Sequence, residues 1–311
     1  MKNYILKRIL QLVPVLFGLT ILTFLLLYIS PGDPAQKKLV SMEQTITEDM
    51  LEDMRKEMGL DRPFIQQYAD WLTDVLHGDF GICYRDGLPV AGKIFKALKN
   101  TALLALSSIF VSILVSIPLG IYSAVHQNRL TDYFIRFISF FGNSIPNFLL
   151  AVLLMYFLCI QTKLFPVLSK GGSFREMILP MMALAIPNAC RFTRQIRAEV
   201  LEQLGKEYVH GMRSRGVNER FVLYRNVLRS AMVSIITLIG LSIGSMMAGS
   251  VVIETIFGWP GMGKLVMDSI TARDYPVVQG FVLIFGTIYV LINLLTDISY
   301  RYLDPRVEKE I

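Results

Sequence analysis

Charged residues are scarce in this sequence. They make up 18% of 311 residues, whereas a soluble domain carries about 25%. The mean hydropathy is +0.49, and 53% of the residues are hydrophobic. So few charges cannot cover a surface that faces water. The composition therefore excludes an ordinary soluble domain and predicts an integral membrane protein.

Cysteine and histidine are also rare, and their positions limit the chemistry. The three cysteines cannot form a disulfide framework, and the three histidines lie in expected loops without a partner at metal-ligand spacing. These residues are Cys83, Cys159, Cys190, His77, His126 and His210. We expect no catalytic residue, cofactor, metal site or nucleic-acid partner.

The hydrophobic residues are gathered into long charge-free runs. A membrane-spanning helix needs about 20 mainly apolar residues. The runs cover residues 9–29, 101–125, 137–160, 177–190, 230–253 and 275–296. The fourth is short and contains Pro180 and Pro187, so it spans only if its helix continues past Arg191 into the headgroup region. The sequence thus predicts an all-α membrane protein with six transmembrane helices.

The basic residues of the loops predict the orientation of these helices, because Lys and Arg favour the cytoplasmic side. Residues 191–229 hold nine Lys or Arg and four Asp or Glu, whereas residues 30–100 hold nine basic and twelve acidic residues. The basic N-terminal tail and the 191–229 segment are then cytoplasmic, and 30–100 is extracytoplasmic. Both termini are expected in the cytoplasm. Without the fourth span, the basic segment would lie on the wrong side.

The expected spans contain no Asp, Glu, Lys, Arg or His at mid-span. Ion-coupled carriers, and enzymes that act within the membrane, need such groups there. The chain therefore favours a transporter driven by other subunits. An ion-coupled secondary carrier or a channel remains the alternative.

Two segments outside the membrane are expected to be helical. In the extracytoplasmic loop, a helix at 64–76 carries Phe64, Tyr68 and Trp71. It either rests on the membrane interface or packs as a cap on the helix ends. In the cytoplasmic segment, a short helix is expected to end at Gly216, a residue suited to the left-handed position after a helix. This helix either lies on the membrane surface or docks in a groove of another protein.

Several short motifs run in order along nearly the whole chain. They are Lys7-Arg8, Pro31-Gly32-Asp33-Pro34, Gly78-Asp79-Phe80-Gly81, Ser144-Ile145-Pro146-Asn147-Phe148, Glu207-Tyr208 through Gly216, Leu228-Arg229-Ser230-Ala231, Glu254-Thr255-Ile256-Phe257-Gly258-Trp259-Pro260-Gly261-Met262-Gly263, Arg273-Asp274-Tyr275-Pro276-Val277-Val278-Gln279-Gly280 and Asp304-Pro305-Arg306. Together they resemble the first (B-type) permease subunit of the peptide/nickel family of binding-protein-dependent ABC importers. The chain departs from the family pattern at Gly211, where Ala is usual, at Ser234, where Pro is common, and at Cys83, where Ser is frequent.

The resemblance implies a type I ABC importer permease fold in the cell membrane. It implies four partners: a second (C-type) permease subunit as heterodimer, two ATP-binding subunits and an extracytoplasmic substrate-binding protein. The short cytoplasmic helix corresponds to the family's coupling helix, which sits in a cleft of an ATP-binding subunit. The coupling residues expected from it are Glu207, Tyr208, Gly211, Met212, Arg213, Arg215 and Gly216.

The resulting organisation has four regions. They are a tail and first span at 1–29, an extracytoplasmic region at 30–100, a permease core at 101–298 that contains the coupling loop at 191–229, and a cytoplasmic tail at 299–311. Small residues in the fifth span allow close approach of helices. They form an interface with the second permease, line the pore, or pack within the subunit. These residues are Gly240, Gly244, Ser245, Ala248 and Gly249.

Residues 258–264 match the spacing of a phosphate-binding P-loop up to Lys264. The next residue is Leu265, so the hydroxyl that a P-loop uses to bind Mg²⁺ is missing. We interpret the run as a turn-rich outer loop, and we expect no ATP hydrolysis by this chain.

The expected substrate is nickel or a nickel chelate, or else a dipeptide or oligopeptide, and nickel is slightly preferred. The loop at 161–176 and the 144–148 stretch somewhat resemble nickel permeases. Methionine in apolar helices usually serves packing, and the substrate-binding protein usually sets selectivity.

Overall fold

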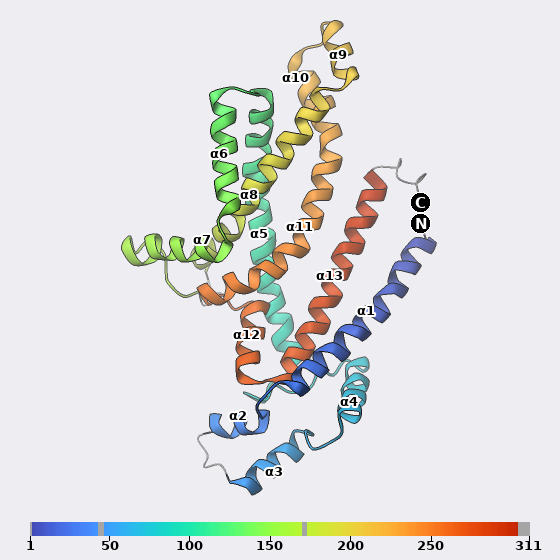
Figure 1. Ribbon diagram of the computed structural model, residues 1–311, viewed down its shortest axis with the longest axis vertical. Coiled ribbons are helices and arrows are strands. Elements are labelled where there is room, and N and C mark those ends of the chain that lie inside the picture. The colour runs from blue at the N-terminus through green and yellow to red at the C-terminus, as the bar shows by residue number, and fades with distance from the viewer. Residues whose placement is uncertain (1, 43–46, 170–172, 304–311) are drawn as a thin grey trace. The chain divides into compact units, whose positions relative to one another are not determined.

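The chain is helical throughout the part that the structure describes. This computed structural model describes residues 2–42, 47–169 and 173–303, and within them the extended pairing is limited to one isolated bridge between Ile82 and Pro89. The Asp304-Pro305-Arg306 motif lies outside these ranges. The helices (Figure 1) are α1 (Lys2–Ile29), α2 (Pro34–Ser41), α3 (Glu48–Glu57), α4 (Phe64–Leu76), α5 (Val90–Val125), α6 (Leu130–Ser144), α7 (Asn147–Leu154), the π-helix η1 (Met155–Gln161), α8 (Phe174–Leu204), α9 (Glu207–Ser214), α10 (Glu219–Phe221), the π-helix η2 (Val222–Val227), α11 (Leu228–Phe257), α12 (Met262–Ala272) and α13 (Tyr275–Leu303).

Four of the described helices are long and apolar enough to cross a membrane. They are Leu10–Ile29 of α1, Val90–Val125 (α5), Ser234–Phe257 of α11 and Tyr275–Thr296 of α13. A bent pair, α6 with α7 and η1, raises the number to five if it counts as one span. The expected first, second, fifth and sixth runs thus lie in such helices. The number six and the position of the termini stay predictions.

The expected third span, residues 137–160, is not one continuous helix. Its two halves, Leu130–Ser144 and Asn147–Gln161, are bent by 97°. The break falls at Ile145 and Pro146, where Ile145 is extended with φ −78° and ψ 124°. Proline disfavours the helical conformation of the residue before it and has no N–H to donate. The third run is therefore bent at Pro146, and its assignment as one span stays a prediction.

The expected fourth span lies inside α8. Pro180 and Pro187 are within this helix and are buried. The helix packs against α6, α7 and α11, and it is not among the helices apolar enough to span by composition. A helix that its neighbours shield from lipid can carry more polar residues than one exposed to acyl chains.

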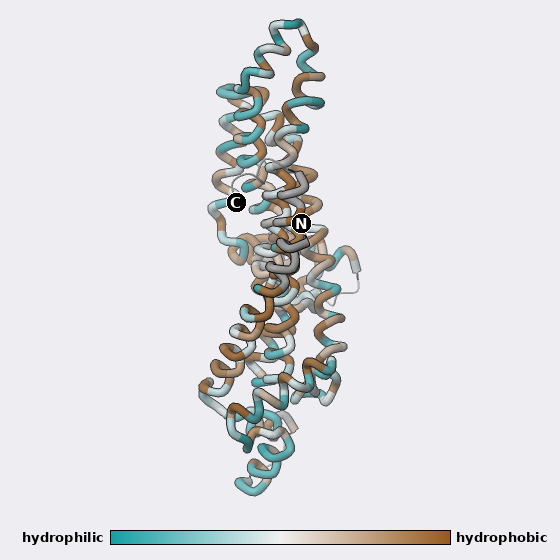
Figure 2. Tube along the Cα trace, turned by 90° about the vertical axis from the view of Figure 1, so that its right-hand side faces the viewer, coloured by the Kyte–Doolittle hydropathy of each residue, from teal (hydrophilic) through white to brown (hydrophobic). Residues whose placement is uncertain are grey.

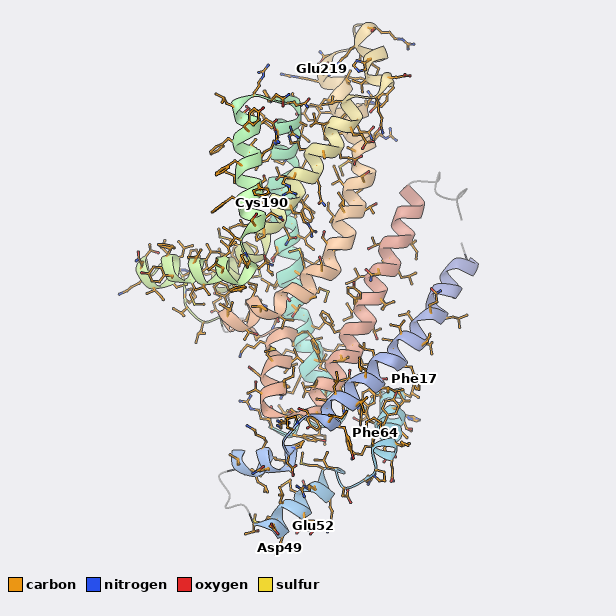
Figure 3. All side chains as sticks on the ribbon, in the orientation of Figure 1. Phe17, Asp49, Glu52, Phe64, Cys190 and Glu219 are labelled. Atoms are coloured by element: carbon orange, nitrogen blue, oxygen red, sulfur yellow. The ribbon has the colours of Figure 1, made fainter. Side chains whose placement is uncertain are left out.

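The chain divides into two compact units. The first comprises residues 1–100 and 260–291, and the second comprises 101–259 and 292–311. In the first unit, α4 packs on α1 through aromatic side chains: Phe24 lies 5.3 Å from Tyr68 and 6.0 Å from Phe64 between ring centroids. The Tyr68 and Thr20 hydroxyls are 3.0 Å apart. Figure 3 shows Phe17 and Phe64 in this region. The helix at 64–76 thus packs along the side of α1 through its aromatic residues.

In the hydropathy colouring of Figure 2, the short helix α3 is mainly hydrophilic, whereas the long spanning helices are mainly hydrophobic.

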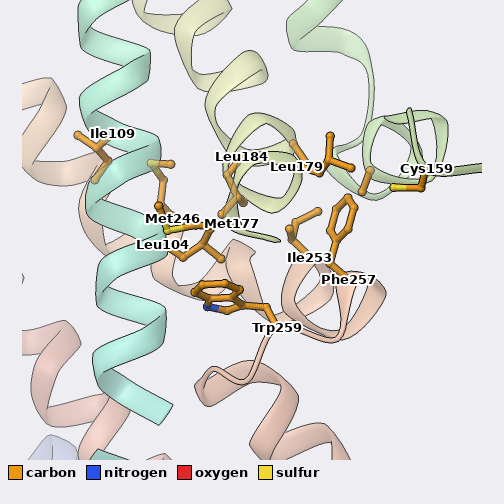
Figure 4. Close-up of a cluster of buried hydrophobic side chains, with 12 residues drawn as sticks. Leu104, Ile109, Cys159, Met177, Leu179, Leu184, Met246, Ile253, Phe257 and Trp259 are labelled. Atoms are coloured by element: carbon orange, nitrogen blue, oxygen red, sulfur yellow. The ribbon is translucent and has the colours of Figure 1, made fainter. Parts of the chain in front are cut away.

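The second unit has a core in which α5, α7, η1, α8 and α11 meet (Figure 4). Phe257 and Trp259 are almost fully buried in this core, beside Leu104 and Leu184. Burial of two large aromatic side chains at the end of α11 fixes this end of the helix to α5 and α8.

Candidate coupling helix and the residues around it

Two residues separate helix α9 from the end of the long helix α8. Gly205 caps α8, Lys206 is extended (φ −77°, ψ 149°), and α9 follows from Glu207. At its other end Gly216 has φ +74°. The Gly216 amide donates to the Arg213 carbonyl (3.0 Å), and the Val217 amide donates to the Met212 carbonyl (3.1 Å). This pair of bonds is the Schellman motif, which favours glycine at the left-handed position.

One face of α9 is anchored in a hydrophobic cluster of the second unit. Val209 is fully buried there, and Met212 and Val217 pack against the same cluster. The cluster includes Phe192 of α8 and Ile235 of α11. The short helix therefore packs on η2, in a hydrophobic cluster that it shares with α8 and α11.

The opposite face of α9 is open to solvent. Glu207, Gly211 and Arg215 are exposed, and among the described residues no acidic or basic side chain pairs with Glu207 or Arg215. A side-chain carbon added at Gly211 would meet nothing within 4 Å. Tyr208 is 38% exposed and donates its hydroxyl to Gln203 Oε1 at 3.3 Å. Tyr208 therefore lies at the edge of the face that carries Val209 and Met212.

Arg213 of the expected coupling set is paired within the chain. Its Nε donates to Glu219 Oε2 at 3.1 Å, and its Nη2 contacts Glu219 Oε1. The hydrogen bonds from Arg213 hold the pKa of Glu219 below its ordinary value, although burial acts the other way. The pair closes the loop between α9 and α10, so Arg213 serves the shape of the loop.

A buried carboxylate, which the sequence had placed just beyond the fifth span, lies inside α11. The expected run stops at residue 253, but the apolar helix continues to Phe257, and Glu254 is fully buried in it. Its Oε1 accepts hydrogen bonds from Thr101 (2.7 Å) and Ser250 (3.1 Å). A buried carboxylate needs such donors. One indication that Glu254 is buried was present in the sequence: it directly follows the charge-free run that ends at residue 253.

The small residues of α11 do not act as one group. A Cβ on Gly240 would lie 2.9 Å from Thr296 Cγ2, so Gly240 allows α13 to approach within the same chain. Gly244 is buried, whereas Ser245 and Ala248 are exposed. Gly249 is half-buried, and a Cβ there would meet nothing within 4 Å. Packing within the subunit thus accounts for Gly240 and leaves an open face of small residues.

The outer motifs come together in the first unit. The Gly32 backbone has φ +109°, and the Arg273 guanidinium lies 2.7 Å from the place where its Cβ would be. Asp274 accepts hydrogen bonds from the Cys83 thiol (2.7 Å) and the Tyr84 amide (3.1 Å). A cavity of about 1100 Å³ opens beside this cluster, lined in part by Asp33, Trp71, Tyr84 and Gln279.

Comparison with known families decides the class of the chain. The family described as "Binding-protein-dependent transport system inner membrane component" matches residues 116–309, and its N-terminal companion family matches residues 1–112. The chain belongs to this family. It is therefore a permease subunit of an ATP-driven importer in the inner membrane, and the carrier or channel alternative is set aside.

Full-length relatives support the assignment. The chain is 38% identical to the oligopeptide transport system permease protein AppB of Bacillus subtilis, with 99% of this chain and 100% of the relative covered. It is 34% identical to the glutathione transport system permease protein GsiC of Escherichia coli, with 99% of each covered. The relatives agree with the resemblance to B-type permeases.

Solved structures of importers share the fold. An inward-facing MetNI methionine ABC transporter chain matches with a TM-score of 0.55 at 15% identity, and covers 68% of this chain and 96% of that one. A chain of an amino acid ABC transporter crystallised with histidines matches with a TM-score of 0.53 at 17% identity, and covers 68% and 94%. At such identities the match shows the fold alone.

The permease leaves ATP hydrolysis to partner ATP-binding subunits, and its family implies a substrate-binding protein as a further partner. The run at 258–264 fits this assignment. Gly258 is the left-handed cap of α11, and Lys264 forms an ion pair with Asp268 at 2.9 Å. These residues end one helix and begin the next. Among the described residues no group of three His, Cys, Asp or Glu is arranged to hold a metal ion.

Proposed function

We propose that this permease forms half of the translocation pathway of a peptide importer and that α9 is its coupling helix. A second, C-type permease subunit supplies the other half, and two ATP-binding subunits drive the pair. Closure of the ATP-binding subunits pushes α9 and moves the long helices between inward-open and outward-open states. An extracytoplasmic binding protein delivers the substrate.

The anchoring of α9 is the observation that carries this proposal. Val209 and Met212 pack one face of the helix into a hydrophobic cluster that includes residues of α8, η2 and α11, and the direct neighbour of α9 is η2. Glu207, Gly211 and Arg215 present the other face to solvent. A helix that is joined rigidly to the bundle transmits displacement as a rigid body. The unpaired charges on the solvent-exposed face of α9 suit a cleft of complementary charge on another protein. Docking on a protein is therefore preferred here to resting on lipid.

Peptides are the proposed substrates, in preference to nickel. Two relatives that match along the whole chain are named as permeases for oligopeptides and for glutathione. Met246 of α11, whose sulfur is of a type that can bind a metal, is buried in the hydrophobic core of the second unit. Uptake of a labelled peptide and of Ni²⁺ by the reconstituted importer compares the two substrates directly. Uptake of Ni²⁺ without peptide uptake would overturn this part of the proposal.

The open face of α11 is the proposed contact with the second permease or the pore. Ser245 and Ala248 are exposed and lie one turn apart, and a side chain at Gly249 would meet no neighbour within 4 Å. Small residues on an exposed membrane helix let a second helix approach closely. Gly240 is excluded from this face because it contacts Thr296.

The decisive experiment is assembly of the permease pair with its ATP-binding subunits in lipid. Glu207→Arg and Gly216→Pro are compared with the native chain for co-purification and for ATP hydrolysis stimulated by loaded binding protein. Glu207→Arg reverses an exposed charge on α9, and Gly216→Pro removes the left-handed cap of the helix. Both variants are expected to insert normally and to lose assembly or stimulated hydrolysis.

Glu52→Arg on the exposed helix α3 is the matched control for charge reversal. Glu52 lies in an i,i+4 pair with Lys56 at 3.8 Å and belongs to the other unit. This variant is expected to assemble with the ATP-binding subunits like the native chain. Normal assembly and stimulation by both α9 variants would show that α9 is not the coupling helix.

A further inference from the structure

A groove of about 810 Å³ lies between α6 and α8 in the second unit. Both helices supply arginines to it, and α6 adds aromatic side chains. The residues used below are Tyr133, Arg136, Phe137, Phe140, Arg194 and Arg197. None of them belongs to the coupling set or to the α11 face.

One of the three arginines is already neutralised. Arg197 donates from Nε and Nη2 to the two carboxylate oxygens of Asp132, each at 2.7 Å. Asp132 is fully buried and also accepts from the Ser123 hydroxyl (2.5 Å) and the Asn128 amide (3.0 Å). This carboxylate has therefore little capacity left to attract the other arginines.

The other two arginines are free of acidic partners. Arg136 and Arg194 are exposed, and within the described residues neither forms an ion pair. The Arg136 guanidinium lies 5.5 Å from the centre of the Tyr133 ring. Farther along α8, Glu202 is occupied by Lys206 at 3.3 Å. Two positive charges thus face the groove without compensation.

The surface around these charges is apolar in a way that suits lipid. Phe137 and Phe140 are 68% and 65% exposed, whereas Asp132 and Ser139 are the buried residues of α6. On a water-soluble protein the apolar residues of a helix are buried, whereas α6 exposes aromatic residues and buries polar ones. This arrangement is favourable where the exposed surface contacts lipid acyl chains. Aromatic and basic side chains together are typical of the headgroup level of a membrane.

The groove also lies close to the coupling helix. Arg197 is seven residues before the end of α8 at Leu204, which corresponds to about 10 Å along a helix. In Figure 1, the N-terminal end of α6 points the same way as the end of α8 that leads to α9. Placing the groove on the cytoplasmic leaflet rests on the proposed function. That leaflet carries anionic lipid in many membranes.

We propose that this groove binds the headgroup of an anionic phospholipid. Arg136 and Arg194 hold the phosphate through charge-assisted hydrogen bonds, and Phe137 and Phe140 contact the acyl chains. The aromatic surface assigns the site to a lipid and not to free phosphate. A bound lipid contacts both α6 and α8, and α8 leads into the proposed coupling helix α9.

The test uses the assembled importer in nanodiscs with a photoactivatable phosphatidylglycerol, followed by mapping of the labelled peptides. Labelling is expected on α6 and α8, and it is expected to be competed by unlabelled phosphatidylglycerol. Neither phosphatidylcholine nor millimolar inorganic phosphate is expected to compete. The variant Arg136→Gln/Arg194→Gln should need a concentration of the photoactivatable lipid about tenfold higher, or more, to reach the same labelling. The reason is that each basic residue near an anionic surface contributes to binding.

The chain offers a matched control for this loss of charge. Arg225 is stacked 5.5 Å from the Phe221 ring, as Arg136 is on Tyr133, but it does not line the groove. Arg220→Gln/Arg225→Gln removes the same number of charges and should label like the native chain. Arg136→Lys/Arg194→Lys keeps the charges and should label more than the glutamine variant, which separates loss of binding from loss of folding.

Four results would overturn the proposal. The first two are equal labelling of the native and glutamine variants and equal competition by phosphatidylcholine. The third is cross-linking of positions Phe137 or Phe140 to the second permease in place of lipid. The fourth is competition by inorganic phosphate alone, which would assign the arginines to a free anion. Because labelling needs no ATP hydrolysis, a failure of the coupling assignment leaves this readout unchanged.

Discussion

Arg197 of α8 and Asp132 of α6 form a bidentate ion pair with both N–O distances at 2.7 Å. The pair joins residues 65 positions apart in the sequence. Asp132 is fully buried, and Arg197 is only partly exposed. The hairpin between α5 and α6 is thereby attached to α8, the helix that leads into the proposed coupling helix α9.

Arg197→Ala is expected to lower the free energy of unfolding by about 3–5 kcal/mol, because it leaves a buried carboxylate without its cation. The double variant Asp132→Asn/Arg197→Gln should lower the free energy of unfolding by less, because it leaves no buried charge without a partner. Arg220→Ala, an exposed arginine on α10, is the control and should change stability little. Thermal unfolding in detergent measures all three. Equal losses for Arg197→Ala and Arg220→Ala would contradict a structural role of the pair.

Two glycines, one within the proposed coupling helix α9 and one just after it, are expected to respond in opposite directions to substitution by alanine. Gly211 lies within α9 with open space around it, so Gly211→Ala should stabilise the helix by about 0.5–1 kcal/mol. Gly216 has φ +74°, and Gly216→Ala should destabilise it by about 1–2 kcal/mol because an L-residue is strained there. Hydrogen exchange of the α9 amides reports both effects. A shift in the same direction for both variants would be inconsistent with the Schellman cap.

The carboxylate of Glu254 depends on donors from two helices. Thr101→Val removes the hydroxyl that donates to Glu254 Oε1 at 2.7 Å. The free energy of unfolding should fall by about 1–3 kcal/mol, as for a buried polar group that loses a partner. Thr255→Val is the matched control, because the exposed Thr255 hydroxyl donates to the Val251 carbonyl of its own helix. Chemical unfolding in detergent compares the two. If Thr255→Val is the more damaging, the bond between Thr101 and Glu254 is not a significant support of α11.

The Cys83 thiol should react slowly and with an unusual pH profile. Burial raises its pKa above the ordinary value of 9.0, and the bond donated to Asp274 acts in the same direction. The thiolate is the reactive form. In the folded chain the rate of alkylation should still be rising at pH 9, where the rate for the unfolded chain begins to level off. The neutral thiol's contribution to stability is present below pH 9 and declines as the pH rises above it.

The rates are measured with iodoacetamide and mass spectrometry between pH 7 and pH 10, with the unfolded chain as reference. Cys83→Ser keeps a small polar donor to Asp274 and should retain the fold. A folded-state profile that levels off below pH 9 would mean that the thiol is not held in its neutral form.

Much of the architecture was predictable because it depends on local pattern. Charge-free runs in the regions of α1, α5, α11 and α13 identify these helices by length and composition alone. The short helix ending before Gly216 was also predictable, since the left-handed position after a helix selects glycine. The angle at Pro146 was not, because proline marks a break but does not set the direction of the chain that follows.

The sequence by itself determined that this chain is a membrane permease, through its apolar runs and the ordered motifs of the family. Only the tertiary structure decided which polar residues are satisfied inside it. Asp132 pairs with Arg197, 65 positions away, and Glu254 accepts a hydrogen bond from Thr101, 153 positions away. Gly240 gives space to Thr296, 56 positions away. Composition and periodicity report on neighbours within a few residues of one another. Pairing between distant helices depends on how their faces pack, and that is settled by the fold as a whole.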